Sequence, residues 1–269
     1  MSKFITILLI ERYIKIMKHS KEVNNIQELF EAIKSIQSAY PYTLWYRGHA
    51  NSSWQLKPSV QRNNLKNYER NIANSFYHRA SQIMANKFPK KSYDQWVSLM
   101  QHYGVPSRLL DWTYSPLVAL YFSLSDMEKY KSNSGCIWIL YPNLLNKLAG
   151  FDSHIYPIDS TTALNMLKPI FTGHYVANEL TEKKILACFS VSADLRIYSQ
   201  KSAFTIHGTN TAPLERMFNT YLYKLIIPSS RKEYFKDVLN TFGIIESAIF
   251  PDYEHISKDI IQKYKQKKD

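Results

Sequence analysis

The segment from Trp96 to Leu124 constrains the fold more than any other part of the sequence; it reads WVSLMQHYGVPSRLLDWTYSPLVALYFSL. A tight turn, Gly104-Val105-Pro106, is followed first by polar residues and then by an apolar run from Leu117 to Phe122. Pro106 and Pro116 each restrict the preceding residue to extended conformations. Polar residues held between a turn and a buried helix are typical of a rigid site. We therefore expect a site at Ser107, Arg108, Asp111, Trp112 and Thr113.

The composition is that of a globular chain that can bury a full core. The 269 residues are 45% hydrophobic and 14% aromatic, with no internal repeat and no linker rich in Gly, Ser or Pro. Helical patterns dominate the first half and strand patterns the second, which predicts a single α+β domain with helices packed on a mixed or antiparallel sheet. We assign this domain to residues 25–262, with residues 1–24 as a dispensable extension and 263–269 as a basic tail.

Hydrophobic periodicity and turn residues predict the individual elements. Helices are expected over residues 25–37, 67–87, 93–103, 116–128, 144–148, 230–242 and 255–265. Strands are expected over residues 40–47, 135–141, 197–205, 222–227 and 245–249. The remaining segments, including 49–62 and most of 155–180, are expected to be loops.

The net charge of +12 raises the question of a nucleic-acid partner. Part of this charge lies near the two termini and the rest is scattered, which does not by itself predict a dedicated nucleic-acid groove. Nucleic acid stays open as a partner.

Cys136 and Cys188 are far apart and flanked by apolar residues, which predicts buried free thiols and a reducing, cytoplasmic location. The histidines are not spaced as metal ligands, so no metal is expected. Residues 4–17 are apolar but interrupted by charges and too short to span a membrane. Because Met17 could serve as a start, we expect the first sixteen residues to be dispensable.

Four separated motifs resemble, in order, those of the FRG-domain family, which is named for its aromatic-Arg-Gly signature. They are WYRGHANSSWQLKPSVQR (45–62), QHYGVPSRLLDWTYSPLVALYFS (101–123), RIYSQKSAFTIH (196–207) and GIIESAIFPDYEHI (243–256). The sequence departs from the family at Lys201-Ser202, where the family usually has Gln-Gly, and at Ser107, where it usually has Thr. The resemblance implies a bacterial or phage-related cytoplasmic protein, tied to mobile elements and anti-phage defence.

A second, weaker resemblance is to the layout of ADP-ribosyltransferases. Arg47-Gly48 ends a predicted strand, Tyr121-Phe122-Ser123 ends an apolar helix, and Gln200 falls on a late predicted strand. In those enzymes an Arg or His on the first strand holds NAD, and a late Glu polarises the ribose. This resemblance implies NAD as the substrate, although a glutamine at the late position cannot carry charge.

Each candidate residue also has a structural interpretation. Arg47 suits a phosphate or carboxylate ligand, yet it could instead pair with Asp111; both hold if Asp111 orients it within a site. Arg108 and Asp111 are three residues apart, so on a helical turn they would face the same side and pair. His102 is expected to orient a ligand or to be a hydrogen-bonded structural residue.

The aromatic candidates and those near the predicted strand 197–205 also have both a functional and a structural interpretation. Trp112 and Tyr121 either flank a base or nicotinamide ring or belong to the core. Gln200 and Phe204 alternate on the predicted strand 197–205, which puts them on one face together with Arg196. The glutamine amide can donate to and accept from a sugar hydroxyl.

Other common catalytic motifs are missing from the sequence, which has no GxGxxG, P-loop, HExxH or GxSxG. We therefore predict a cleft that binds a nucleotide-like anion, with Arg47, Asp111 and Gln200 as catalytic candidates. Candidate ligand-binding residues are Gly48, His102, Ser107, Arg108, Trp112, Tyr121, Arg196 and Phe204. The alternatives are a non-catalytic sensor of nucleic acid or a phage protein, and a toxin that acts on a host macromolecule.

Overall fold

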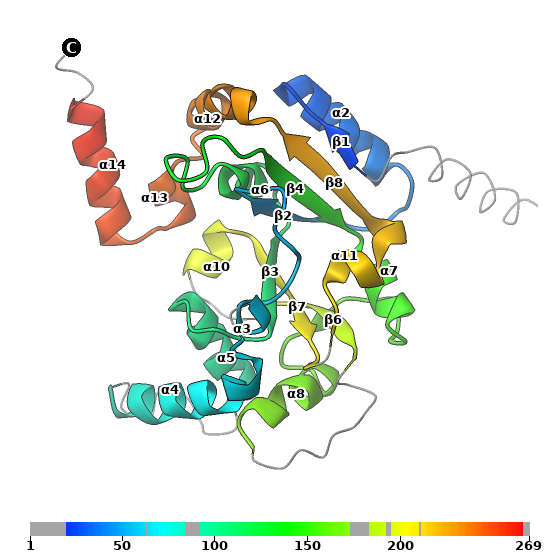
Figure 1. Ribbon diagram of the computed structural model, residues 1–269. Helices are drawn as coiled ribbons and strands as arrows, with labels where there is room; N and C mark the ends of the chain where they lie inside the picture. Colours follow the sequence, from blue (N-terminus) through cyan, green and yellow to red (C-terminus); the bar gives the residue numbers. More distant parts are fainter. Residues whose placement is uncertain are drawn as a thin grey trace, which may run out of the picture.

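The computed structural model describes residues 20–62, 64–83, 92–172, 183–191, 195–209 and 211–265. These residues form one mixed sheet with the strand order β1-β8-β4-β2-β3-β7-β6-β5 (Figure 1). The pairs β1–β8 and β5–β6 are parallel and the others antiparallel. The strands are β1 (Ser20–Glu22), β2 (Trp45–His49), β3 (Leu109–Thr113), β4 (Gly135–Leu140), β5 (Tyr156–Pro157), β6 (Ile185–Phe189), β7 (Ser202–His207) and β8 (Leu222–Ile227).

The helices pack on both faces of this mixed, mostly antiparallel sheet. Helices packed on such a sheet confirm the predicted α+β class. They are α2 (Ile26–Gln37), α3 (Ser59–Arg62), α4 (Glu69–Ile83), α5 (Tyr93–His102), α6 (Pro116–Ser123), α7 (Pro142–Leu148), α8 (Thr161–Leu167), α10 (Leu195–Ser199), α11 (Leu214–Met217), α12 (Lys232–Thr241), α13 (Glu246–Ile249) and α14 (Tyr253–Lys265). Short 3₁₀ turns cover η1 (Lys66–Tyr68), η2 (Lys168–Ile170), η3 (Asn219–Tyr221) and η4 (Ser229–Arg231).

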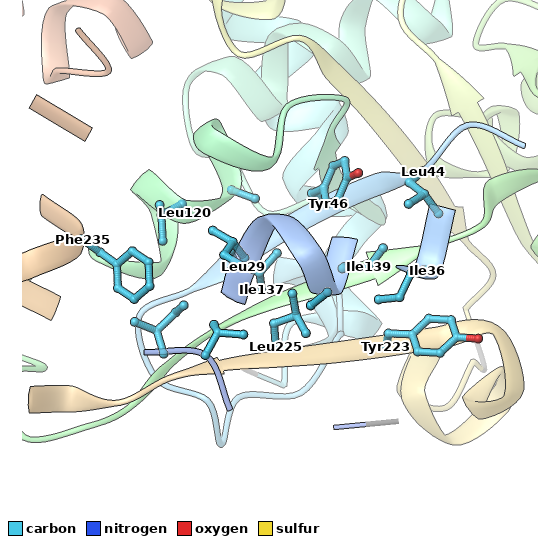
Figure 2. Close-up of a cluster of buried hydrophobic side chains, with 14 of the residues drawn as sticks. Leu29, Ile36, Leu44, Tyr46, Leu120, Ile137, Ile139, Tyr223, Leu225 and Phe235 are labelled. Atoms are coloured by element: carbon cyan, nitrogen blue, oxygen red, sulfur yellow. The ribbon is translucent and has the colours of Figure 1, made fainter. Parts of the chain in front are cut away.

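Alternation of side chains along the strands gives each face of the sheet its own core. One face carries two clusters: the first packs β2, β4 and β8 against α2, α6 and α12 (Figure 2). The second packs β3, β6 and β7 against α4, α5 and α8. Tyr46 of the first cluster pairs directly with Thr113, which faces the same way as Leu109 of the second, so the two clusters share a face. The third cluster, around Trp45 and Trp112, fills the opposite face.

Helix α6 lies unusually close to the sheet because two glycines face it. A Cβ at Gly48 would stand 1.9 Å from the carbonyl oxygen of Ala119 and 2.5 Å from the amide nitrogen of Ser123. A Cβ at Gly135, on the neighbouring β4, would stand 2.4 Å from the carbonyl oxygen of Ser123. Glycine is therefore needed at both positions for α6 to pack this closely on β2 and β4.

Several predicted elements are wrong. The predicted strand 245–249 is instead the helical turn α13 (Glu246–Ile249) with Ile245 before it, because Ile245 and Ile249 also have the spacing of one helical turn. Residues 197–205 divide into the end of α10 and β7, with Lys201 in the left-handed region at φ 47 between them.

The predicted termini are only partly described. Residues 1–19 and 266–269 lie outside the described part of the chain, so the division into extension, domain and tail stays a prediction. The end of the expected extension belongs to the sheet, because Ser20–Glu22 pair with β8 and Val23 is buried.

Both cysteines are buried and unpaired, as predicted. Burial raises the pKa of the Cys136 thiol to about 12, which makes it a poor nucleophile. In the described part of the chain, no helix has the length and apolarity to cross a bilayer, and no group of side chains is arranged to hold a metal.

Candidate functional site

A cavity of about 250 Å³ opens where strands β2 and β3 diverge. The two strands are paired at one position, Tyr46 with Thr113, whereas β2 pairs with β4 along five. The cavity lies on the face shared by the two clusters, between α6 on one side and α5 on the other. Residues from β7, from α10 and the residues after it, and from the segment that joins α13 to α14 complete its walls. The separation of the strands thus creates the space in the middle of the sheet.

Arg47 bridges the diverging strands. Its Nη1 donates to the backbone carbonyl of Asp111 at 2.7 Å and lies 3.6 Å from a carboxylate oxygen of the same residue. Its Nε donates to Nε2 of His49 at 3.1 Å. Arg47 therefore satisfies a strand carbonyl that no neighbouring strand reaches, and its charge remains at the edge of the cavity. Arg47 and Asp111 meet, and both the structural and the ligand-binding interpretation fit this contact.

The Asp111 carboxylate is oriented by a chain of hydrogen bonds. Nε2 of Gln101 donates to both carboxylate oxygens, at 2.9 and 2.8 Å. The hydroxyl of Ser107 donates to Oε1 of Gln101 at 2.7 Å, which fixes which end of the amide faces the aspartate. Oγ of Ser107 in turn accepts from the amide of Leu109 at 3.1 Å. With its side chain 48% exposed, Asp111 presents a fixed negative charge to the cavity.

A second arginine lies in the opposite wall. Nη1 of Arg196 donates to the backbone carbonyl of His102 at 3.0 Å, and the guanidinium lies 4.6 Å from the centroid of the Phe250 ring. Nε2 of Gln200 donates to the carbonyl of Ile249 at 3.3 Å. These contacts join α5, α10 and α13 into one wall. They arise from a helix and the residues after it, not from the strand that we predicted.

Aromatic rings line the rest of the cavity. Phe122 and Phe250 meet edge to face with centroids 6.1 Å apart, while the buried ring of Phe204 lies on β7. Trp112 also lines the cavity, but its indole N–H donates to the Thr205 hydroxyl at 3.1 Å inside the third cluster. Trp112 therefore belongs to the core and contributes only part of its surface to the cavity.

Three predicted ligand-binding residues do not line the cavity. Arg108 is buried and forms a two-bond ion pair with Glu69 at 2.9 and 2.6 Å, so the predicted pairing with Asp111 is wrong. The prediction assumed a helical turn, but Arg108 directly precedes strand β3, and its guanidinium is bonded to Glu69 of α4 and to the carbonyl of Met166 of α8. Ser107 does not line the cavity, but its hydroxyl orients Gln101, which does.

Tyr121 is the third of these residues. It lies beside the first cluster and contacts the rings of Phe122 and Phe250 from outside the cavity. Its neighbour Phe122 lines the cavity instead. The helical pattern alone did not distinguish these two adjacent aromatic residues.

Of the other predicted site residues, Gly48 and His102 both line the cavity. Several lining residues were not among the candidates that the sequence motifs indicated, and Gln101, Phe122 and Phe250 are the ones that matter most for the site. Gln101 directly precedes His102 in the QHYG turn motif, which is the only local signal for it. Phe250 lies far along the chain from the central motif, and only folding brings it to the cavity.

Two buried histidines next to this site should make the fold sensitive to acid. Burial, reinforced by the charge of Arg47, lowers the pKa of His49 to about 2 and that of His207 to about 3. The unfolded chain binds these protons below roughly pH 6.5 and the folded chain does not, so stability falls as the pH drops from there towards pH 3. We expect a loss on the order of 1 kcal/mol per pH unit for each histidine.

Urea unfolding at pH 7.0, 6.0 and 5.0 measures this loss. His207→Gln should show a shallower dependence on pH than the wild type, because glutamine does not titrate and can still bond to Thr205, whose hydroxyl lies 3.0 Å from the histidine ring. His78→Gln, which changes a histidine on the polar surface of α4, serves as the control and should leave the slope unchanged. Equal slopes in all three proteins would contradict the assignment.

The fold and the cavity together define a class: an α+β protein with a site at a split in its single sheet, lined by two arginines, one carboxylate and several aromatic rings. Residues 42–132 match the FRG domain, a span that runs from just before β2 through α6 and includes Arg47, Gln101 and Asp111. The chain therefore contains an FRG domain, as its motifs indicated. No curated protein matches the chain. No solved structure matches it either.

Proposed function

We propose that the cavity binds a nucleotide-like anion, with NAD as the first candidate, and that the protein transfers ADP-ribose from it. The observation that carries this proposal is the convergence of Arg47, Arg196 and Asp111 on one aromatic-walled cavity. Two guanidiniums face a single carboxylate there, so the net charge of these groups favours an anion. Guanidinium groups match phosphate oxygens in geometry as well as in charge.

The size of the cavity limits how much of the ligand it encloses. Its 250 Å³ is just below the roughly 300–1,000 Å³ usual for ligand pockets, which suits one base-and-sugar unit better than a whole dinucleotide. We place the nicotinamide and its ribose between Phe122, Phe204 and Phe250. The pyrophosphate then extends towards Arg196, whose guanidinium already borders the Phe250 ring.

Asp111 is the group best placed to act on the ribose. Its carboxylate is held by Gln101 and faces the cavity. There it can accept a hydrogen bond from a hydroxyl of the sugar, and its negative charge can stabilise positive charge on the ribosyl carbon. The bond from that carbon to the nicotinamide nitrogen breaks, and nicotinamide leaves with the bonding electrons. An oxygen or nitrogen of the acceptor then bonds to the carbon, and its proton passes to Asp111 and on to water.

Gln200 and Arg47 then have roles different from those first assigned. One N–H of the Gln200 amide is bonded to Ile249, so we assign Gln200 the orientation of the wall near the ribose. Arg47 is held by Asp111 and His49, so it orients the aspartate and adds charge to the site. The direct contact with phosphate passes to Arg196. In the cell, we place this activity in the cytoplasm, as a toxin of anti-phage defence or of a mobile element.

Ligand binding is tested by thermal unfolding with NAD. At about 100 times the dissociation constant, binding adds about 2.7 kcal/mol of stability, and the melting temperature should rise by about 5–10 °C. Arg196→Ala should weaken NAD binding at least about tenfold, because a charge-assisted bond to phosphate is lost. Binding of nicotinamide riboside, which fills the same part of the cavity but has no phosphate, should change little in the same variant.

Turnover is measured as nicotinamide release and as growth arrest on expression. Asp111→Asn keeps the shape of the side chain and should lower release at least about a hundredfold while NAD still binds. Asp237→Asn, which changes an exposed aspartate of α12, is the matched control. If NAD neither raised the melting temperature nor was consumed, the proposal would be wrong. Nucleic-acid binding that weakens steeply with salt and ignores Asp111→Asn would favour the sensor instead.

A further inference from the structure

Helix α14 stands away from the sheet and is joined to the rest of the protein through α13 (Figure 1). None of its residues is buried. It is held on one side, where the carboxylate of Asp259 accepts the amide N–H of Ser247 at 2.9 Å. On the same side the ring of His255 stacks on Phe250 with centroids 5.0 Å apart. The orientation of α14 is therefore set by its contacts with Ser247 of α13 and with Phe250, and much of its remaining surface is exposed.

The face turned away from these contacts is apolar. Tyr253, Ile256, Ile260 and Tyr264 recur every three or four residues, which aligns them along one stripe. They are 90%, 42%, 54% and 62% exposed, and Ile261 beside them is 55% exposed. A continuous apolar stripe left open to water is typical of a surface that another molecule covers.

Charged residues flank this stripe in an ordered way. Glu254 directly follows Tyr253, and Lys265 directly follows Tyr264, so both lie on one flank. Asp259 directly precedes Ile260, and Lys263 directly precedes Tyr264, so both lie on the other flank, the one nearer α13. One carboxylate oxygen of Asp259 is bonded to Ser247, so only the other oxygen can meet a partner. On each flank the acidic residue comes first and the basic residue lies closer to the C-terminus.

This order of charges identifies the occupant. We propose that α14 pairs with α14 of a second copy of the chain, antiparallel, about a two-fold axis near Ile260. In an antiparallel pair, each flank of one helix faces the same flank of the other helix. Glu254 therefore meets Lys265 of the second copy, and Asp259 meets its Lys263. In a parallel pair every one of these charges would face its like. An acidic or a basic partner would fit only half of the helix.

The apolar stripe fits the same register. With Ile260 opposite itself, Ile256 lies opposite Tyr264 of the second copy, and the same pairing repeats on the other side of the axis. The sums of the paired residue numbers agree closely, because 254 and 265, 256 and 264, and 259 and 263 share nearly the same midpoint. The charge pairs and the apolar pairs therefore fit the same antiparallel register to within about two residues. The pairing does not depend on which ligand the cavity binds.

Sedimentation of the full chain over about 1–100 μM tests the pairing, since a single-helix interface is expected to be of modest affinity. The wild type should pass from monomer to dimer in this range. Ile260→Glu should raise the dissociation constant at least about a hundredfold, because the two-fold axis brings the two new charges together. Since Ile260 is exposed, this variant should fold, and an unchanged melting temperature at low concentration confirms that it does. Gln262→Glu, on the polar face, is the control and should leave the dimer intact.

A charge exchange separates this register from a nonspecific association. Glu254→Lys and Lys265→Glu should each weaken the dimer, and the double variant should recover most of the loss because both cross-pairs are restored with reversed signs. A wild type that stays monomeric at 100 μM would overturn the proposal. So would a dimer that survives Ile260→Glu, a double variant weaker than both single ones, or a monomer whose α14 binds anionic lipid vesicles instead.

Discussion

Glu69→Gln should lower the free energy of unfolding by about 3–5 kcal/mol, the largest loss that we expect from a single side chain. The carboxylate of Glu69 is 6% exposed and forms two hydrogen bonds with Arg108, whose Nη1 also donates to the carbonyl of Met166 at 2.8 Å. Glutamine keeps nearly the same shape but leaves the arginine charge buried without its counter-ion. The pair joins α4 to the start of β3, so this loss acts on the scaffold of the cavity. Urea unfolding at pH 7 measures it.

Two further variants show whether the loss comes from the unpaired charge. The double variant Glu69→Leu with Arg108→Met removes both charges, so it should be more stable than Glu69→Gln alone. Lys258→Gln breaks the ion pair of Lys258 with Glu254, which is 2.6 Å long but exposed, and should have no measurable effect. If Glu69→Gln were as stable as the wild type, the ion pair would not be a main support of the fold.

Gly48→Ala should destabilise the protein by about 3 kcal/mol or more and lower its melting temperature by about 10 °C. The added methyl group would meet the backbone of α6 at 1.9 Å from the oxygen of Ala119, and backbone cannot move aside as a flexible side chain can. Relief requires α6 to move away from β2, which would displace Phe122 from the cavity. Thermal unfolding reports the stability, and NAD binding reports the displacement.

Gly104→Ala is the matched control for this glycine. Gly104 has φ +71 but no atom within 4 Å of the position of a Cβ. Alanine there should lower the free energy of unfolding by only about 1–2 kcal/mol, the cost of a left-handed backbone conformation for a residue with a Cβ. It also leaves α6 in place, so ligand binding should be kept. A Gly48→Ala protein as stable as Gly104→Ala would show that α6 is not held against β2 as closely as the structure places it.

Local sequence predicted α2, β4, β8 and the start of α6, because their signals are contained within each segment, but it did not predict β3, β6 or α8. Asn25 caps α2 with a side chain that accepts the amide N–H of Glu28, and Ser115 and Pro116 begin α6. The same locality explains the failures. The apolar spacing around Ile245–Ile249 fits a strand or a helical turn, and nothing within five residues decides between them.

The sequence predicted many of the residues of the candidate site, but it predicted little of their arrangement in space. The motifs placed Arg47 and Asp111 in one site, and the structure brings their side chains together. They did not distinguish Arg108, which lines no part of the cavity, from Arg196, which does. Both arginines lie in family-like motifs, and the difference is the buried carboxylate of Glu69, which binds Arg108 across 39 residues of chain.

The sequence by itself determined the FRG motifs, the α+β class and the residue types available for an anion site. Only the tertiary structure decided that β2 and β3 diverge, that Gln101 and Ser107 orient Asp111, and that Phe250 completes the wall. The reason is physical: periodicity and capping depend on residues a turn apart, whereas ion-pair choice, strand separation and burial depend on which distant segments pack together.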